Sequence, residues 1–479
     1  NFNHFAIAEE VTLKGNLERR PDLVVYINGI AFGVIELKKS TVSVNEGIRQ
    51  SISNQQDRFN EWFYSTVQFT AAGNDSEGLR YGKIKTPEQF YLKWKEDENE
   101  TEDYKLDKYI KKIFKKERIL ELIFDFIIFD GGKKKVPRAN QYFAIKEAQK
   151  SINRKEGGII WHTQGSGKSI IMVLLSKWIL ENNSNSIVII ITDREDLDDQ
   201  IEDIFNFSGE KIYRAKSGKD LIEKLDSPSP RLLCSLIHKF GKKGIDDFES
   251  YIKKTLNSSS NVFGEIFVMV DECHRTQSGK LHKLMKSYLK DSIFIGFTGT
   301  PLLKKDKKTS IETFGKYIHR YLLDEAVTDK VILDIVYEAR DVDQFLGSKD
   351  RIDQWFDSKT KNLNKWQKIS LKKKWTTMQS ILSSESRSIR IVNDIIFDFS
   401  IKPGLCTDRG TAMLVANNIF EACRYYELFN KTELKDKCAI ITSYNPNASH
   451  ISLEDTGANS ESDKEFIFNT YEKILKDIS

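Results

Sequence analysis

A glycine-containing loop, His162 to Ser169, has the residue types needed to hold the phosphates of a nucleotide. It follows a short apolar run and opens an apolar helical segment, where backbone amides at a helix N-terminus attract anions. We expect Lys168 to reach the β- and γ-phosphates of ATP and the Ser169 hydroxyl to hold Mg²⁺. The backbone amides that we expect to contact the phosphates belong to Gly165, Ser166 and Gly167. The strict form of this loop has glycine at position 162, so a chance glycine turn before a helix is the alternative.

Two acidic residues follow a second apolar run, Ile266–Val270. Asp271 is placed to hold Mg²⁺, and Glu272 to orient or deprotonate an attacking water. A third run ends in small and hydroxyl residues that are expected to couple the nucleotide site to a neighbouring surface: Thr298, Gly299 and Thr300. Each motif alone could be a capped loop. Three in this order, all at the carboxyl ends of predicted strands, predict a nucleotide site.

A second set of chemical residues lies near the N-terminus, where Asp22 and the pair Glu36 and Lys38 flank a predicted hairpin. Two carboxylates suit Mg²⁺, a cation that prefers oxygen ligands, and an adjacent lysine can assist hydrolysis of a phosphodiester. Glu36 and Lys38 share one face of a strand because they are two residues apart. A two-residue turn at Asn28-Gly29 would pair Asp22 with Ile35 and place Glu36 on the other face. An odd-length loop restores the shared face, for example three residues with Gly29 in a bulge, so we predict that Asn28-Gly29 does not form a simple two-residue turn.

The intervening elements follow from hydrophobic periodicity. The hairpin strands are predicted at Leu23–Ile27 and Ala31–Leu37, followed by a helix from Val44 to about Phe63 and a strand at Ser65–Ala71. Further along, short apolar runs alternate with amphipathic segments, which is typical of buried parallel strands joined by helices. These runs are Gly158–Trp161, Ser186–Thr192, Leu232–Ser235, Ile266–Val270 and Ser292–Phe297. Strands are also predicted at Thr411–Val415 and Ala439–Ser443, and a lysine-rich helix at Lys359–Lys374.

Composition sets broad limits. The 479 residues allow two to four domains, and 39% hydrophobic and 30% charged residues are typical of a globular protein. No apolar run is long enough to cross a membrane. The five cysteines are scattered and unpaired in sequence, which favours a reducing cytoplasm over a disulfide framework or a zinc site. A net charge of +4 identifies no partner.

The three nucleotide motifs resemble motifs I, II and III of superfamily-2 helicases. Thr192-Asp193-Arg194 resembles motif Ia of this family, and the stretch from Ser235 to Phe240 resembles motif Ib. The resemblance therefore implies DNA contacts at Asp193, Arg194 and Lys239, and adenine recognition by Gln141.

Together with the N-terminal residues, the chain resembles the R subunits of type I restriction enzymes, in which the nuclease precedes the motor. The resemblance implies a DNA contact at Gln50. Asn54 stands where the family often has a tyrosine, and it cannot stack on a base or sugar. The resemblance to the R subunits further implies ATP and Mg²⁺ as cofactors, double-stranded DNA as substrate, and methyltransferase and specificity subunits as partners. The alternative is a stand-alone helicase or remodelling ATPase whose N-terminal module binds DNA without cutting it. A non-catalytic scaffold would need both nucleotide motifs without ATP binding.

These inferences predict an α/β multidomain chain: a restriction-endonuclease-like core followed by RecA-like, doubly wound parallel-sheet domains. The expected boundaries are an endonuclease domain at 1–95 with its N-terminal part missing, a charged helical connector at 96–136, a first motor domain at 137–330 and the start of a second at 331–479. The sequence ends before anything like motifs V and VI, so we expect the chain alone to hydrolyse ATP poorly. The lysine runs at 304–308 and 372–374 suit DNA phosphates, although solvated loops are the simpler interpretation.

Overall fold

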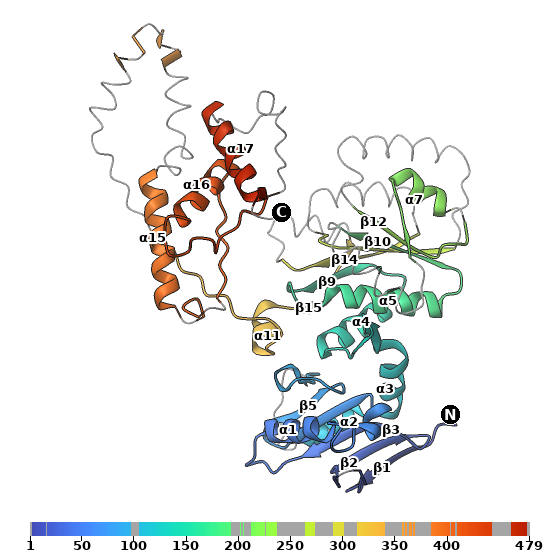
Figure 1. The fold of residues 1–479 in the computed structure, drawn as a ribbon. Coiled ribbons are helices and arrows are strands. Elements are labelled where there is room, and N and C mark those ends of the chain that lie inside the picture. The colour runs from blue at the N-terminus through green and yellow to red at the C-terminus, as the bar shows by residue number, and fades with distance from the viewer. Residues whose placement is uncertain are drawn as a thin grey trace. The chain divides into compact units, whose positions relative to one another are not determined.

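The computed structural model describes residues 2–96, 105–192, 212–236, 264–273, 291–300, 314–340, 385–442 and 461–476, apart from single positions inside these ranges, and a few isolated residues between them. The chain divides into two compact units, Asn1–Ile335 and Val336–Ser479. Figure 1 shows two sheets in the first unit and a group of helices in the second.

The first sheet has the strand order β1-β2-β3-β4-β5-β6. Its strands are β1 (Phe5–Glu9), β2 (Leu23–Ile27), β3 (Ile30–Leu37), β4 (Phe69–Asn74), β5 (Gly78–Gly82) and β6 (Leu92–Lys93). All neighbours are antiparallel except β3 and β4, which are parallel and joined by the helix α1 (Val44–Asn54). The predicted hairpin strands are confirmed. The predicted helix ends earlier, at Asn54, and β4 begins later than predicted because the 3-10 helix η1 (Glu61–Ser65) precedes it.

The two faces of this sheet are covered by different helices. On one face Ile35 and Ala71 belong to the same buried cluster as Tyr109 of α2 (Lys105–Ile113). On the other face Ala72 packs with Ile48 of α1. Because successive strand residues point to opposite faces, Glu36 lies on the face covered by α1. The segment predicted as a charged helical connector contributes α2 to the core of this sheet, with Tyr109 fully buried.

The second sheet has seven strands in the order β11-β12-β10-β13-β14-β9-β15, all parallel. They are β9 (Gly158–His162), β10 (Ser186–Thr192), β11 (Tyr213–Arg214), β12 (Leu232–Leu236), β13 (Glu265–Val270), β14 (Ile293–Thr298) and β15 (Tyr317–Tyr321). All five predicted runs are strands of this sheet, within one residue of their predicted ends. Their side chains are almost entirely buried because helices cover both faces of such a sheet.

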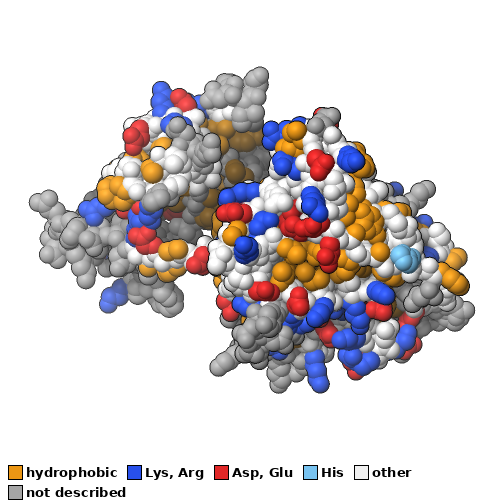
Figure 2. Space-filling view, turned by 90° about the horizontal axis from the view of Figure 1, so that it is seen from below, with side chains coloured by type: hydrophobic (Ala, Val, Ile, Leu, Met, Phe, Trp, Pro, Cys, Tyr) orange, Lys and Arg blue, Asp and Glu red, His pale blue; other side chains and the backbone are white. Residues whose placement is uncertain are grey.

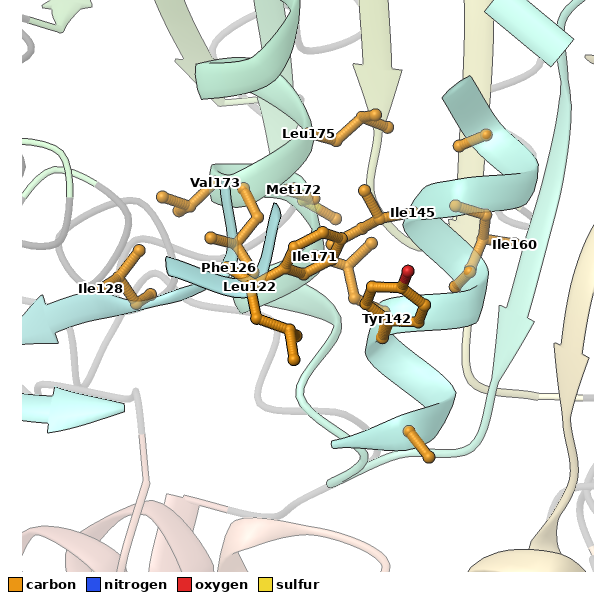
Figure 3. Packing of buried hydrophobic residues seen from close by; sticks show 14 of the residues in the cluster. Leu122, Phe126, Ile128, Tyr142, Ile145, Ile160, Ile171, Met172, Val173 and Leu175 are labelled. Atoms are coloured by element: carbon orange, nitrogen blue, oxygen red, sulfur yellow. The ribbon is translucent and has the colours of Figure 1, made fainter. Parts of the chain in front are cut away.

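Helices of the second sheet include α4 (Ala139–Asn153), α5 (Lys168–Asn182), α7 (Gly218–Leu225) and α11 (Leu323–Thr328). Between the two sheets run α3 (Lys116–Glu121), the π-helix η3 (Leu122–Phe126) and the hairpin of β7 (Ile128–Asp130) and β8 (Lys133–Lys135). Figure 3 shows Phe126 in one packed cluster with Tyr142 of α4 and Ile171 of α5. The rings of Phe126 and Tyr142 are 4.7 Å apart. One buried cluster extends from Val25 in the first sheet to Phe297 in the second, so the first unit has a continuous core.

The described part of the second unit consists of α15 (Glu385–Ile401), α16 (Ile419–Phe429) and α17 (Glu461–Lys476). The strand predictions at Thr411–Val415 and Ala439–Ser443 are wrong over the residues that the structure describes, which are irregular there. Val415 and Ile441 are largely exposed. A single apolar run needs a neighbouring strand to satisfy its backbone groups, and the described residues of this unit offer none. The start of a second motor domain at 331–479 stays a prediction.

The surface carries charged side chains of both signs. On the face shown in Figure 2, Lys and Arg side chains are interspersed with Asp and Glu side chains, as the near-balanced net charge leads one to expect. Among the described residues no helix is long and apolar enough to cross a bilayer.

Candidate active sites

The register of β2 and β3 decides whether the N-terminal carboxylates meet. The prediction about the turn is wrong: Ile27 pairs directly with Ile30, and Asn28-Gly29 forms a two-residue turn with positive φ angles of 52° and 81°. The ladder then shifts between Tyr26 and Val25, so that Leu23 pairs with Ile35. One extra residue on β3, Phe32, is accommodated by this bulge. The shift brings Asp22 opposite Glu36 and restores the shared face by a different route.

Glu36 is fully buried, and side-chain amides hold both of its oxygens. Gln50 Nε2 donates to Oε2 at 2.7 Å and Asn54 Nδ2 donates to Oε1 at 3.0 Å. These two residues are four apart on α1, so they present neighbouring side chains to the carboxylate. The Oε1 of Gln50 accepts a hydrogen bond of 2.8 Å from Lys38 Nζ. Gln50 therefore bridges the acid and the lysine.

Asp22 and Lys38 complete this cluster. Asp22 Oδ2 accepts a 2.6 Å hydrogen bond from the backbone N–H of Leu37 and lies 4.0 Å from Lys38 Nζ. Gly47 lets α1 approach closely: a Cβ atom there would lie 3.0 Å from the Cβ of Ala72 and 3.3 Å from the Cγ of Lys38. The absence of that side chain thus leaves room for the stem of Lys38 beneath α1.

Burial and charge in this cluster favour the binding of a cation. The pKa of Glu36 is raised to about 8, first by burial and then by the negative charge of Asp22, while Lys38 acts in the opposite direction. Two adjacent carboxyl groups that repel each other are stabilised by a cation placed between them.

The donor set fits a divalent metal ion such as Mg²⁺. It offers carboxylate oxygens only, which is the ligand chemistry of a hard cation. No group of three or more acidic, histidine or cysteine residues able to hold a metal occurs among the described residues. Asp22 and Glu36 supply two carboxylates. Mg²⁺ commonly binds through one or two carboxylates, with water and substrate phosphate in the remaining positions.

The nucleotide motifs meet at the carboxyl ends of neighbouring strands in the second sheet. β14 lies between β9, which leads into the phosphate loop, and β13, which leads to Asp271 and Glu272. Both acidic residues are buried. A Cβ atom on Gly299, just after β14, would lie 2.9 Å from Lys168 Nζ. The structure thus brings the three sequence-predicted motifs together.

The phosphate loop has the backbone that its glycines allow. Gly165 and Gly167 have φ angles of +81° and +89°, and Gly167 is the residue before α5 begins at Lys168. The Ser166 hydroxyl donates to Thr163 O at 2.6 Å and closes the loop. Lys168 Nζ lies 3.4 Å from the carbonyl of His162. This arrangement fits a nucleotide triphosphate, because backbone amides and a lysine converge at a helix N-terminus.

Gln141 contacts this loop directly. Its Oε1 accepts from the backbone N–H of Arg138 at 2.9 Å, and its Nε2 donates to the carbonyl of Gly167 at 3.2 Å. The side chain therefore ties the start of α4 to the loop. Its predicted contact with adenine stays a prediction.

Residues 140–369 match the family described as SWI2/SNF2 ATPase, and residues 1–89 match the family described as type I restriction enzyme R protein N terminus. Both domains thus occur in one chain, in the order expected from the sequence. The N-terminal residues thus resemble the type I restriction enzyme R proteins, and the residues that follow resemble the SWI2/SNF2 ATPases.

Curated relatives include two restriction endonuclease subunits of Methanocaldococcus jannaschii. The putative type I restriction enzyme MjaIXP endonuclease subunit is 28% identical, over 93% of this chain and 45% of the relative. The putative MjaVIIIP endonuclease subunit is 31% identical, over 70% of this chain and 36% of the relative. This chain therefore spans less than half the length of these relatives. A solved structure of a nuclease-deletion mutant of the type ISP restriction-modification enzyme LlaGI, in complex with a DNA substrate mimic, is 16% identical with a TM-score of 0.32, over 71% of this chain and 33% of that one. That similarity is too low to support a further statement.

Of the predicted DNA contacts, only one lies among the described residues. Asp193, Arg194 and Lys239 lie outside the described residues, as do the lysine runs at 304–308 and 372–374. Gln50 is described, and its amide is engaged between Glu36 and Lys38.

Sequence reasoning missed one pair at the nucleotide site. His319 lies on β15 next to His162, the residue at the first position of the phosphate loop. The two positions are 157 residues apart, and the pairing of β15 with β9 brings them together. No signal in the sequence relates them.

Proposed function

We propose that this chain is the motor and nuclease part of a restriction subunit that couples ATP-dependent translocation on double-stranded DNA to Mg²⁺-dependent double-strand cleavage. The observation that carries the proposal is the convergence of Asp22, Glu36 and Lys38 on one face of a sheet, in the same chain as a phosphate loop. The subunit would act in the cytoplasm within a complex of methyltransferase and specificity subunits.

In the nuclease, Asp22 and Glu36 would hold the metal, and Lys38, beside them, would stabilise charge on the scissile phosphate. When bound, Mg²⁺ supplies a more acidic water and a counter-charge for the phosphate. Gln50 keeps Lys38 and Glu36 in fixed relation through hydrogen bonds of 2.8 and 2.7 Å.

In the motor, Gly165, Ser166 and Gly167 offer backbone amides to phosphate oxygens, and Lys168 neutralises their charge. Ser169 and Asp271 are the proposed Mg²⁺ ligands, and Glu272 orients the attacking water. Thr298, Gly299 and Thr300 are proposed to couple this site to a neighbouring surface, and Gly299 borders Lys168. Asp193, Arg194 and Lys239 are the proposed backbone contacts on DNA.

Plasmid cleavage by the assembled complex tests this proposal. The intact subunit carrying Asp22→Ala should lose ATP-dependent cutting and retain DNA-stimulated ATP hydrolysis, because the two sites lie on separate sheets. Lys168→Ala should lose both activities. Cutting that survives Asp22→Ala would refute the nuclease site and favour a helicase or remodelling ATPase whose N-terminal module does not cleave.

A further inference from the structure

Two cationic residues continue the row of side chains to which the Glu36 carboxylate belongs. Glu36 of β3 is paired with Ala72 of β4. Ala72 is paired in turn with Arg80 of β5, and Arg80 with Lys93 of β6. Residues paired on neighbouring strands point to the same face of a sheet. Glu36, Arg80 and Lys93 therefore lie on one face, in one line across the strands.

The packing around β5 supports this assignment of faces. The sequence neighbours of Arg80, Leu79 and Tyr81, belong to the buried cluster on the face that α2 covers. Arg80 must then point to the other face, where Ala72 packs against α1. Arg80 and Lys93 are both half-buried. Long cationic side chains on a partly covered face keep their charged ends in contact with solvent, so both charges are accessible to a ligand.

The two cations stand where they repel each other. Arg80 and Lys93 are directly opposite on the antiparallel strands β5 and β6, and like charges in this position are destabilising. Neither side chain makes a hydrogen bond or an ion pair with any residue that the structure describes. A repulsive pair that no described carboxylate neutralises is suited to an anionic ligand.

The spacing along the row suits a nucleic acid strand. Neighbouring strands of a sheet are about 4.8 Å apart, so Arg80 lies about 10 Å from Glu36 along the row and Lys93 about 14 Å. The phosphates of one DNA strand recur about every 3.4 Å along the helix axis. A DNA strand with one phosphate at the Glu36 carboxylate thus has further phosphates level with both cations.

We propose that Arg80 and Lys93 bind backbone phosphates on one side of the scissile phosphate and so hold the DNA strand across the nuclease sheet. This inference rests on the proposed nuclease function and adds the path of the DNA over that site. A phosphate between the two cations removes their mutual repulsion and gives each a charge-assisted hydrogen bond.

Removal of either charge should impair cutting in the assembled complex. Arg80→Gln and Lys93→Gln should each lower the rate of ATP-dependent plasmid cleavage about tenfold, because a hydrogen bond to a charged group is lost. The salt concentration that halves the cleavage rate should fall as well, since phosphate contacts carry the salt dependence of DNA binding. Arg80→Lys keeps the charge and should retain most of the activity. DNA-stimulated ATP hydrolysis should stay at the wild-type level in all three variants.

Two further measurements separate DNA binding from support of the fold. Mn²⁺ binding to the intact subunit without nucleotide is followed by the loss of the electron paramagnetic resonance signal of free Mn²⁺. The part of this binding that Asp22→Ala removes should be unchanged in Arg80→Gln and Lys93→Gln. The urea midpoint of both variants should stay constant or rise, because the repulsion between the two cations is relieved.

Lys111→Gln is the matched control. Lys111 lies on α2, which covers the opposite face of the same sheet, and its side chain is 78% exposed. This variant removes the same charge from the same domain without touching the row. Its cleavage rate and salt dependence should therefore equal those of wild type.

The outcomes distinguish this inference from the function on which it rests. Wild-type cleavage and salt dependence in Arg80→Gln and Lys93→Gln overturn the DNA contact and leave the nuclease standing if Asp22→Ala abolishes cutting. An equal loss in Lys111→Gln, or a loss of cutting that follows a loss of Mn²⁺ affinity or of stability, overturns it too. Lys93 is on the edge strand β6, so Lys93→Gln keeps the test valid if Arg80→Gln fails to fold. Cutting that survives Asp22→Ala refutes the proposed nuclease, and this inference with it.

Discussion

The Nε2 atom of His162 lies 2.8 Å from the Nδ1 atom of His319 at the base of the phosphate loop. Asn140 Nδ2, which can only donate, lies 3.4 Å from His162 Nδ1. His162 then carries its proton on Nε2 and donates it to His319, so both rings are neutral. Burial, aided by His319 and Lys168, lowers the pKa of His162 well below its usual value, and burial also lowers the pKa of His319.

This pair should make the protein less stable in mild acid. Below pH about 6.5 the unfolded chain protonates both imidazoles while the folded chain does not, so stability falls as the pH falls. The urea midpoint of wild type should drop between pH 7.5 and 5.5, and His319→Gln should reduce this drop. The exposed His4 gives a control, His4→Gln, which should keep the wild-type drop. An equal drop in all three proteins would contradict the assignment.

Glu36 should act in the opposite direction when no metal is added. Its pKa rises from 4.5 to about 8 on folding. The stabilisation is fully present below pH 4.5 and is lost as the pH rises through 8, because the unfolded carboxyl releases a proton that the folded one keeps. Glu36→Gln keeps the neutral shape, so its unfolding midpoint should change less than that of wild type between pH 6 and pH 8.5. A parallel decline in both proteins would argue against a raised pKa at Glu36.

Gly167→Ala should weaken ATP binding about tenfold. A left-handed backbone costs an alanine about 1–2 kcal/mol, and about 1.4 kcal/mol corresponds to one factor of ten in affinity. The added Cβ would also overlap Gln141 Nε2. Gly404 has a similar left-handed backbone, with a φ angle of +96°, and a Cβ atom there would meet no atom within 4 Å. Gly404→Ala is therefore the matched control. Fluorescent-nucleotide titration should find normal affinity in Gly404→Ala, and equal loss in both variants would point to general destabilisation.

Tyr81→Phe should destabilise the junction between the two sheets of the first unit. The buried Tyr81 hydroxyl donates to Pro137 O at 2.8 Å, directly before α4. Removing it leaves a buried carbonyl without its donor, at a cost of about 1–3 kcal/mol. Tyr109 is equally buried, and its hydroxyl makes no hydrogen bond with the described residues, so Tyr109→Phe should be close to neutral. Denaturant unfolding of the two variants tests the difference, and similar midpoints would refute the prediction.

The sequence by itself determined five of the seven strands of the second sheet and the order of the nucleotide motifs. Runs such as Ser186–Thr192 are apolar at each inner position, because each strand there is buried on both faces. Glycines at 165 and 167 likewise determine a loop backbone that other residues rarely adopt. Such signals are local, so spacing and residue type were sufficient.

The tertiary structure decided how distant residues meet. The Asn28-Gly29 turn alone would have separated Asp22 from Glu36, and a bulge within β3 brings them together. Whether a bulge forms depends on how Phe32 packs in the core, which no local pattern encodes. The contacts of Glu36 with Asn54 and of His162 with His319 likewise arise from packing between separate elements. The apolar run at Thr411–Val415 predicted a strand that the structure does not have. A strand also needs a neighbouring strand to pair with, and hydrophobic periodicity carries no information about that neighbour.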